Sequence, residues 1–137
     1  MTIQKIDLTE YSKFVETLTS DESNSTELMI DRIRKLENDG CNVSLLLTSA
    51  VGLSAEAGEF TEIVKKMIFQ GKPYNDDNHF HMVRELGDIV FYLVNACRAL
   101  NVDPNEIFFE NVRKLEARYP GGKFNASQSE VRAEGDL

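Results

Sequence analysis

Two pairs of acidic residues carry the clearest chemical signal in this sequence. Glu56 and Glu59 lie three positions apart, and Glu85 and Asp88 repeat that spacing further along the chain. Residues at positions i and i+3 share one face of a helix, so each pair would present two carboxylates in one direction. Two facing helices could then gather four carboxylates around one point. A metal ion is a natural candidate to neutralise such a group.

The surroundings of the second pair strengthen this interpretation. Residues 86–97 are apolar on nearly every side of a helix, and a helix of that kind is expected to be buried. A buried carboxylate without a partner costs several kcal/mol, roughly, even after the protein relaxes. Glu85 and Asp88 therefore require a cation. The alternative to a metal ion is a salt bridge to Arg84 or Arg98.

The first pair also has a simpler interpretation, because most Glu-x-x-Glu pairs on helices are solvated surface charges. Glu62 extends the same acidic row, and we expect it to be solvated rather than a ligand. Lys65 and Lys66 follow near the end of the same segment. They could meet phosphate oxygens or simply face solvent.

A third group combines polar and basic residues near a glycine-containing loop. Asn111, Lys114 and Arg118 fall on one helical face, and Tyr119 and residues 121–123 (GGK) come next. Arginine binds phosphate through two parallel hydrogen bonds, and lysine acts as a compact positive charge. The face could therefore hold phosphate groups. It could equally be an exposed basic surface, which the dipole at a helix C-terminus favours.

The elements that must position these residues are all helices. Apolar residues recur at helical spacing, and prolines, glycines and polar clusters mark the ends of each segment. The expected helices cover residues 8–19, 26–38, 42 or 44 to 69, 79–100 and 104–119, with turns at 20–25 and 71–73. No strand pattern appears. The sequence predicts an all-α bundle of about four to five helices, with the active site between the two long ones.

The domain organisation expected from this pattern is a single helical domain over residues 1–124, followed by a flexible polar tail over residues 125–137. The helix at 79–100 is apolar on more sides than one small chain can cover. We therefore expect association into a homodimer or homotetramer that completes the site.

Composition narrows the possible partners and the location. The chain has 137 residues and a formal charge of -8, which disfavours binding to a nucleic-acid polymer. No segment is apolar enough to span a membrane and the N-terminus lacks a signal-peptide pattern, so we expect no membrane partner. Cys41 and Cys97 are far apart and fit reduced thiols. A cytoplasmic location is expected.

Three stretches together resemble MazG-like nucleotide pyrophosphohydrolases, a family marked by Glu-x-x-Glu, a spacer and Glu-x-x-Asp. They are GLSAEAGEF (52–60), RELGDIVFYL (84–93) and NVRKLEARYPGGKF (111–124), and the similarity runs from about residue 45 to residue 124. Some members carry two adjacent glutamates where this chain has Ala55 before Glu56. That difference leaves open the number of metal ions and the identity of the general base.

The resemblance implies specific roles for the residues described above. It implies Mg²⁺, with Mn²⁺ as a substitute, bound by Glu56, Glu59, Glu85 and Asp88. It also implies a family activity, the hydrolysis of nucleoside triphosphates to the monophosphate and pyrophosphate, in dimers or tetramers. The residues that it implies for substrate contact are Asn111, Lys114, Arg118 and Tyr119. In this interpretation water, activated by the metal or by a carboxylate, attacks the α-phosphorus.

Two functions from other classes are alternatives to this one. A di-iron carboxylate bundle needs Glu-x-x-His pairs, but neither His79 nor His81 lies three residues after a glutamate. A non-catalytic helical adaptor would explain the helices but would leave the acidic pairs within them unexplained.

Overall fold

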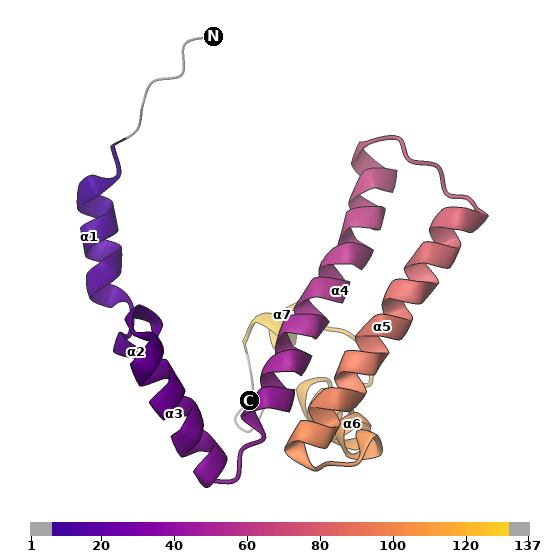
Figure 1. Cartoon of the computed structure of the whole chain (residues 1–137). Helices are drawn as coiled ribbons and strands as arrows, with labels where there is room; N and C mark the ends of the chain where they lie inside the picture. The colour runs from indigo at the N-terminus through magenta and orange to yellow at the C-terminus, as the bar shows by residue number, and fades with distance from the viewer. Residues whose placement is uncertain (1–6, 132–137) are drawn as a thin grey trace. The chain divides into compact units, whose positions relative to one another are not determined.

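The computed structural model describes residues 7–131, and every regular element in that range is a helix (Figure 1). The all-α prediction is therefore confirmed for the described part of the chain. Residues 1–6, where a signal peptide was not expected, and residues 132–137 of the predicted tail lie outside it. The helices are α1 Thr9–Leu18, α2 Asp21–Asn24, α3 Thr26–Asn38, α4 Val43–Phe69, α5 Asp76–Leu100, α6 Pro104–Arg118 and α7 Ala126–Glu130.

The chain divides into two compact units, Met1–Val43 and Ser44–Leu137. In the first unit, α1 and α3 occupy the two expected segments. The turn expected at residues 20–25 instead contains the one-turn helix α2. The hydroxyl oxygen of Ser20 accepts a hydrogen bond from the N–H of Ser23 at 3.3 Å, and this cap supports the extra turn.

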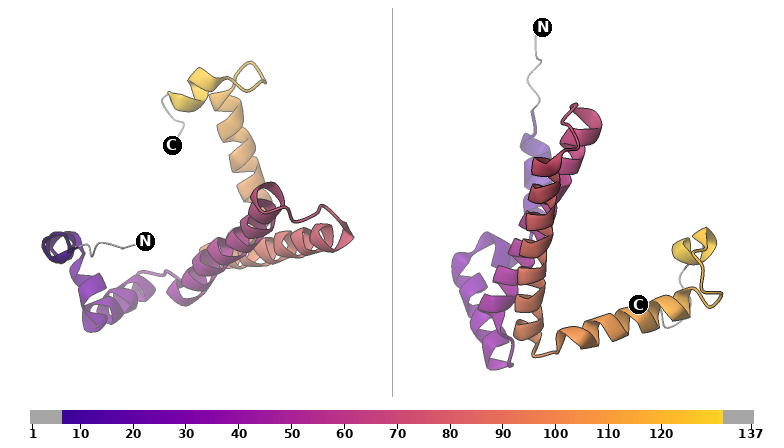
Figure 2. Two further views of the ribbon diagram at one scale, coloured as in Figure 1. Left: turned by 90° about the horizontal axis from the view of Figure 1, so that it is seen from above. Right: turned by 90° about the vertical axis from the view of Figure 1, so that its right-hand side faces the viewer.

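The second unit is built on the long helices α4 and α5, which lie side by side and run in opposite directions (Figure 1, Figure 2). A short loop joins them, and Gly71 adopts the left-handed conformation there, with φ of +71°. Asn75 caps α5 by accepting the N–H of Asn78 at 3.0 Å, and the Asn78 side chain donates to the carbonyl of Pro73 at 2.6 Å. These bonds start α5 at Asp76, three residues before the expected position.

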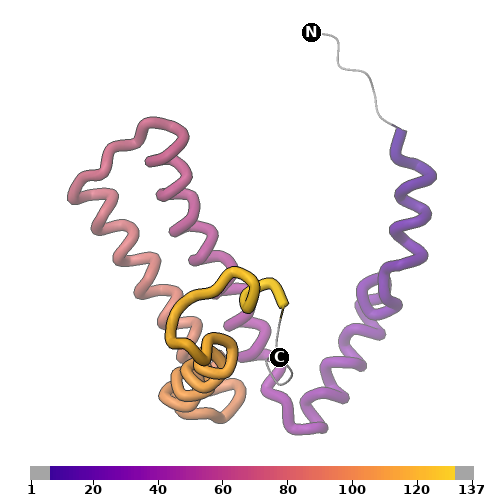
Figure 3. The backbone as a smooth tube through the Cα atoms, turned by 180° about the vertical axis from the view of Figure 1, so that it is seen from behind, coloured from indigo at the N-terminus to yellow at the C-terminus, as the bar shows by residue number. Residues whose placement is uncertain are grey.

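Two short connections complete the second unit. Asn101 ends α5 in the left-handed conformation, and Asp103 with Glu106 forms a capping box at the start of α6, with Pro104 in the first turn. After α6 the chain turns back into α7 (Figure 3). Asn125 caps α7 by accepting the N–H groups of Ser127 and Gln128. The segment expected to be a flexible polar tail thus contains one short helix, Ala126–Glu130.

Helices α4 and α5 approach closely where α4 has small residues. Gly52 is buried, and Ser49 beside it is fully buried, with its hydroxyl donating to the carbonyl of Leu45 at 2.7 Å. A Cβ atom built on Gly52 would lie only 2.2 Å from Cδ1 of Tyr92 on α5. The missing side chain of Gly52 therefore makes room for the tyrosine ring and sets the spacing of the two helices.

Gly52→Ala is expected to lower the free energy of unfolding by about 1–3 kcal/mol, the usual cost of overpacking. Urea denaturation measures the change. The matched control is Gly58→Ala on the same helix, where an added Cβ meets nothing within 4 Å. That variant should gain about 0.5–1 kcal/mol, because alanine is a better helix former than glycine. Equal effects of the two substitutions would contradict the close contact at Gly52.

The apolar faces of α5 are not all covered within the single chain, as expected for a helix that is apolar on more sides than one small chain can cover. Its apolar residues Val90 and Phe91 are 54% and 60% exposed, and Leu86 and Val94 are exposed as well. Among the described residues, Cys97 is the one apolar side chain that is buried. A two-helix hairpin covers only one face of each helix, so the remaining apolar faces of α5 stay open to solvent.

No helix within residues 7–131 has the length and apolar character needed to cross a lipid bilayer.

Candidate metal centre

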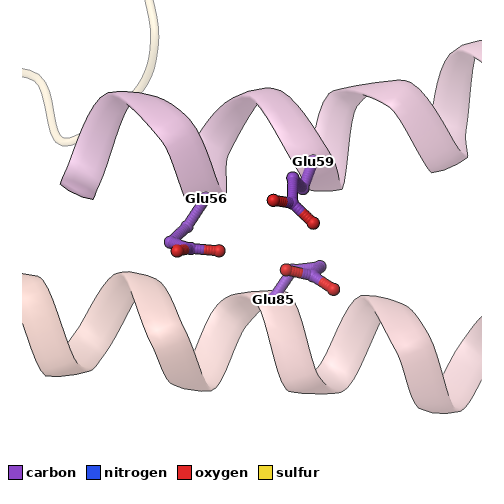
Figure 4. A group of neighbouring side chains, drawn as sticks. All are labelled: Glu56, Glu59 and Glu85. Atoms are coloured by element: carbon purple, nitrogen blue, oxygen red, sulfur yellow. The ribbon is translucent and has the colours of Figure 1, made fainter. Parts of the chain in front are cut away.

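Three of the four predicted carboxylates meet between α4 and α5. Glu56 and Glu59 extend from α4 toward Glu85 on α5 (Figure 4). One carboxylate oxygen from each residue lies within 4.8 Å of the other two. The i, i+3 spacing places both α4 residues on the side that faces α5, as expected from the sequence. We call Glu56, Glu59 and Glu85 the acidic cluster.

Asp88, the fourth predicted carboxylate, is exposed and is not among the three residues gathered within that distance. It is close enough for its charge to raise the pKa of Glu56. The structure thus places Asp88 beside the acidic cluster rather than inside it. Glu85 is half-buried, so the deep burial expected for this pair is not observed.

The acidic cluster favours the protonated form of Glu56. Partial burial is the largest cause of its raised pKa, and the charges of Glu59, Asp88 and Glu85 and a side-chain hydrogen bond with Glu85 add to it. Neighbouring carboxylates raise one another's pKa because like charges repel at short range. A divalent cation bound here would relieve that repulsion.

We expect Glu56→Gln to stabilise the apo protein at about pH 7 and to have little effect at about pH 4. A carboxyl group with a raised folded-state pKa contributes stability that is fully present below its unfolded pKa. That stability is lost as the pH rises through the folded pKa. Glutamine is neutral at every pH, so the free energy of unfolding of the variant, relative to the wild type, should increase as the pH rises from about 4 to about 7. Urea unfolding of both proteins with a chelator present measures it, and a difference independent of pH would contradict the repulsion.

The arginines proposed as alternative partners do not neutralise this site. Arg98 donates to the side-chain oxygen of Asn95 at 2.9 Å. Arg84 forms no ion pair with any residue in the range 7–131. The salt-bridge alternative for Glu85 and Asp88 therefore finds no support in the structure.

Glu62 takes no part in the acidic cluster. It pairs with Lys65 and, at 3.1 Å, with Lys66, and all three side chains are partly exposed. Hydrogen bonds from these two lysines lower the pKa of Glu62. These two partly exposed ion pairs agree with the expectation that Glu62 is solvated and is not a metal ligand. They also give both lysines a carboxylate partner.

A pocket of about 410 Å³ opens next to the acidic cluster. Its volume falls in the range of small-molecule sites, which is about 300–1,000 Å³. Its acidic lining residues are Glu59, Glu62 and Glu85. The full lining is Ala55, Gly58, Glu59, Glu62, Ile63, Lys72, His81 and Glu85. Sequence reasoning had not selected Lys72 or His81 as site residues, although His81 lies four residues before Glu85 and so on the same helical face.

The basic group predicted on α6 lies at a separate hollow. Asn111 and Lys114 share the helical face expected from their spacing and line a hollow of about 730 Å³ along α6. Tyr119 packs against Phe124, with ring centroids 5.8 Å apart. Neither Arg118 nor Tyr119 lines this hollow, and the two pockets share no residue.

The segment that contains the acidic cluster and the α6 residues matches a known protein family. The family model described as the MazG nucleotide pyrophosphohydrolase domain matches residues 46–122. The matched segment contains most of α4, all of α5 and α6, and every site residue predicted from the sequence. No curated protein and no solved structure matches the chain.

Proposed function

We propose that this chain, which belongs to the MazG nucleotide pyrophosphohydrolase family, hydrolyses nucleoside or deoxynucleoside triphosphates. The products would be the monophosphate and pyrophosphate, and the reaction would require Mg²⁺. The observation that carries the proposal is the acidic cluster. It lies between two helices of the matched segment and places three carboxylates within 4.8 Å of one another. Within residues 1–124, taken as one catalytic domain, α4 and α5 would form the site.

The chemistry of the cluster fits a divalent metal. Mg²⁺ prefers oxygen ligands and is usually held by carboxylates together with substrate phosphates, and Mn²⁺ accepts the same ligands. The electrostatics of Glu56 support the fit: after partial burial, the main cause of its raised pKa, the charges of Glu59, Asp88 and Glu85 raise it further, and a cation would offset those charges. When bound, the ion would supply positive charge to the triphosphate and to the departing pyrophosphate.

The side chains of this chain would divide the remaining work. Glu56, Glu59, Glu85 and Asp88 would hold the metal, and one of them would orient the attacking water and accept its proton. Asn111, Lys114, Arg118 and Tyr119 of the α6 region would contact the substrate. The α6 cations would stabilise the negative charge that develops on the phosphates.

A homo-oligomer is part of this proposal. Val90 and Phe91 on α5 and Val51 on α4 are each more than half exposed. Contiguous exposed apolar surfaces usually mark interfaces, and a symmetric dimer or a dimer of dimers would cover these helices. A clean monomer in sedimentation at micromolar concentration would contradict it.

A turnover panel tests the proposed activity. We expect the purified chain to hydrolyse at least one common nucleoside or deoxynucleoside triphosphate with Mg²⁺ and none with a chelator. Anion-exchange chromatography, without added pyrophosphatase, should find monophosphate and pyrophosphate. Diphosphate with inorganic phosphate would contradict the proposed reaction. Absence of turnover with every triphosphate would favour the helical adaptor instead.

A further inference from the structure

Lys72 gives the pocket beside the acidic cluster a positive side. It lies in the loop between α4 and α5, is half-buried and lines the same pocket as Glu59 and Glu85. Its backbone N–H donates to the carbonyl of Lys66 at 3.1 Å, directly after the left-handed turn at Gly71. The loop backbone therefore anchors Lys72 at the end of the pocket nearest the connection between the helices.

The neighbouring lysines show why Lys72 is distinctive. Lys65 and Lys66 both pair with Glu62 and line no part of the pocket. Lys72 forms no ion pair with any carboxylate in the described part of the chain, although carboxylates line the same pocket. Lys72 is thus a cationic residue of the pocket lining whose charge no carboxylate of the described residues pairs with.

The rest of the lining combines three carboxylates with a second nitrogen side chain and small residues. Because Glu59, Glu62 and Glu85 make the pocket acidic, a phosphate group would bind there together with the metal ion. His81 lies one helical turn before Glu85 and supplies a second nitrogen side chain to the same pocket. Ala55 and Gly58 line it on α4 and occupy little volume. Asp76 and Asp77 in the first turn of α5 are exposed and do not line the pocket, so their charges do not form part of its wall.

We propose that Lys72, assisted by His81, binds the terminal phosphates of the substrate, the pair that departs as pyrophosphate. The triphosphate would then extend from the acidic cluster toward the α4–α5 loop. This inference rests on the proposed function. It assigns the leaving-group end of the site to the loop between α4 and α5. The α6 cations would act on the other side of the substrate.

Binding of pyrophosphate itself tests this assignment without relying on turnover. Isothermal titration of pyrophosphate with Mg²⁺ present compares the wild type with Lys72→Met, which keeps the length of the side chain and removes its charge. We expect the Kd for pyrophosphate to rise about tenfold or more, the usual effect of losing one charge-assisted hydrogen bond. Lys72→Arg should recover most of the affinity, and the Kd for a nucleoside monophosphate should be unchanged.

Lys65→Met is the matched control, since Lys65 does not line the pocket and its partner Glu62, which does, keeps its ion pair with Lys66. Its Kd for pyrophosphate should stay within about twofold of the wild-type value. The inference is overturned if Lys72→Met binds pyrophosphate as the wild type does. It is also overturned if both variants lose affinity equally, or if the wild type binds no pyrophosphate.

The turnover panel separates this inference from the proposed function. If the wild type hydrolyses triphosphates but its affinity for pyrophosphate does not depend on Lys72, the function stands and the assignment of Lys72 falls. If no triphosphate is hydrolysed but pyrophosphate binding requires Lys72, the anion site stands and the proposed reaction falls.

Discussion

Replacing Glu59 with glutamine is expected to reduce Mg²⁺-dependent turnover by about a hundredfold or more. Glu59 supplies one of the three carboxylates gathered within 4.8 Å. Changes to groups that only support a metal ligand already cost about 10–100-fold in affinity or activity, so loss of a ligand should cost at least as much. The apo protein should be as stable as the wild type or more stable, because the substitution removes one of the like charges that act on Glu56.

The measurement combines initial rates at saturating substrate with urea unfolding in the presence of a chelator. Asp77→Asn is the matched control, since Asp77 is an exposed acid on α5 outside the acidic cluster and the pocket. It should leave turnover near the wild-type value. If Glu59→Gln unfolds the protein instead, the carboxylates are structural and the assignment of the metal centre is wrong.

Asp88→Asn extends this experiment to the residue beside the cluster. The proposed four-carboxylate site requires a loss of turnover comparable with that of Glu59→Gln. Turnover near the wild-type value would limit the metal centre to Glu56, Glu59 and Glu85, the residues that the structure brings together.

Most helix boundaries could be predicted because local signals determine them. α3 covers the expected residues 26–38, and the Asp103–Pro104 pair correctly marks the start of α6. The start of α5 differs because residues 75–78 (NDDN) contain several possible caps. The bond from Asn78 to the carbonyl of Pro73, which cannot be read from local pattern, selects Asn75 as the cap. Short helices such as α2 and α7 depend on a single cap and have too few residues to show periodicity.

The acidic cluster was predictable to the extent that it depends on spacing within each helix. The i, i+3 rule places Glu56 and Glu59 on one face, but only the packing of α4 on α5 decides which carboxylates come within 4.8 Å. The burial of α5 could not be predicted in the same way. Periodicity shows which faces are apolar, whereas burial depends on what covers those faces.

Contacts between distant residues explain what the sequence did not reveal. The contact of Gly52 with Tyr92 joins two helices, and Lys72 reaches the pocket from a loop. Neither residue stands out in a pattern of charge or hydrophobicity, because each acquires its role from a neighbour on another element.

The proposed positions of the acidic cluster and Lys72 predict which phosphorus of the triphosphate is attacked. The sequence contains no GxxxxGK[ST] loop to surround the β- and γ-phosphates, which argues against transfer of the γ-phosphoryl group. In the proposed site, Glu59, Glu85 and Lys72 line one pocket, and Lys72 belongs to the loop that joins α4 and α5. A terminal pyrophosphate held by Lys72 would leave the α-phosphorus beside the acidic cluster, where a carboxylate can orient water.

Hydrolysis in water labelled with heavy oxygen is therefore expected to place the label in the nucleoside monophosphate and none in pyrophosphate. Attack at the α-phosphorus forms a bond from the water oxygen to that atom and breaks its bond to the bridging oxygen, which departs with pyrophosphate. The water proton passes to a carboxylate of the cluster. Mass spectrometry of both products after a single turnover measures the position of the label. Label in pyrophosphate would show attack at the β-phosphorus and overturn this geometry, even if both products are those proposed and every carboxylate proves essential.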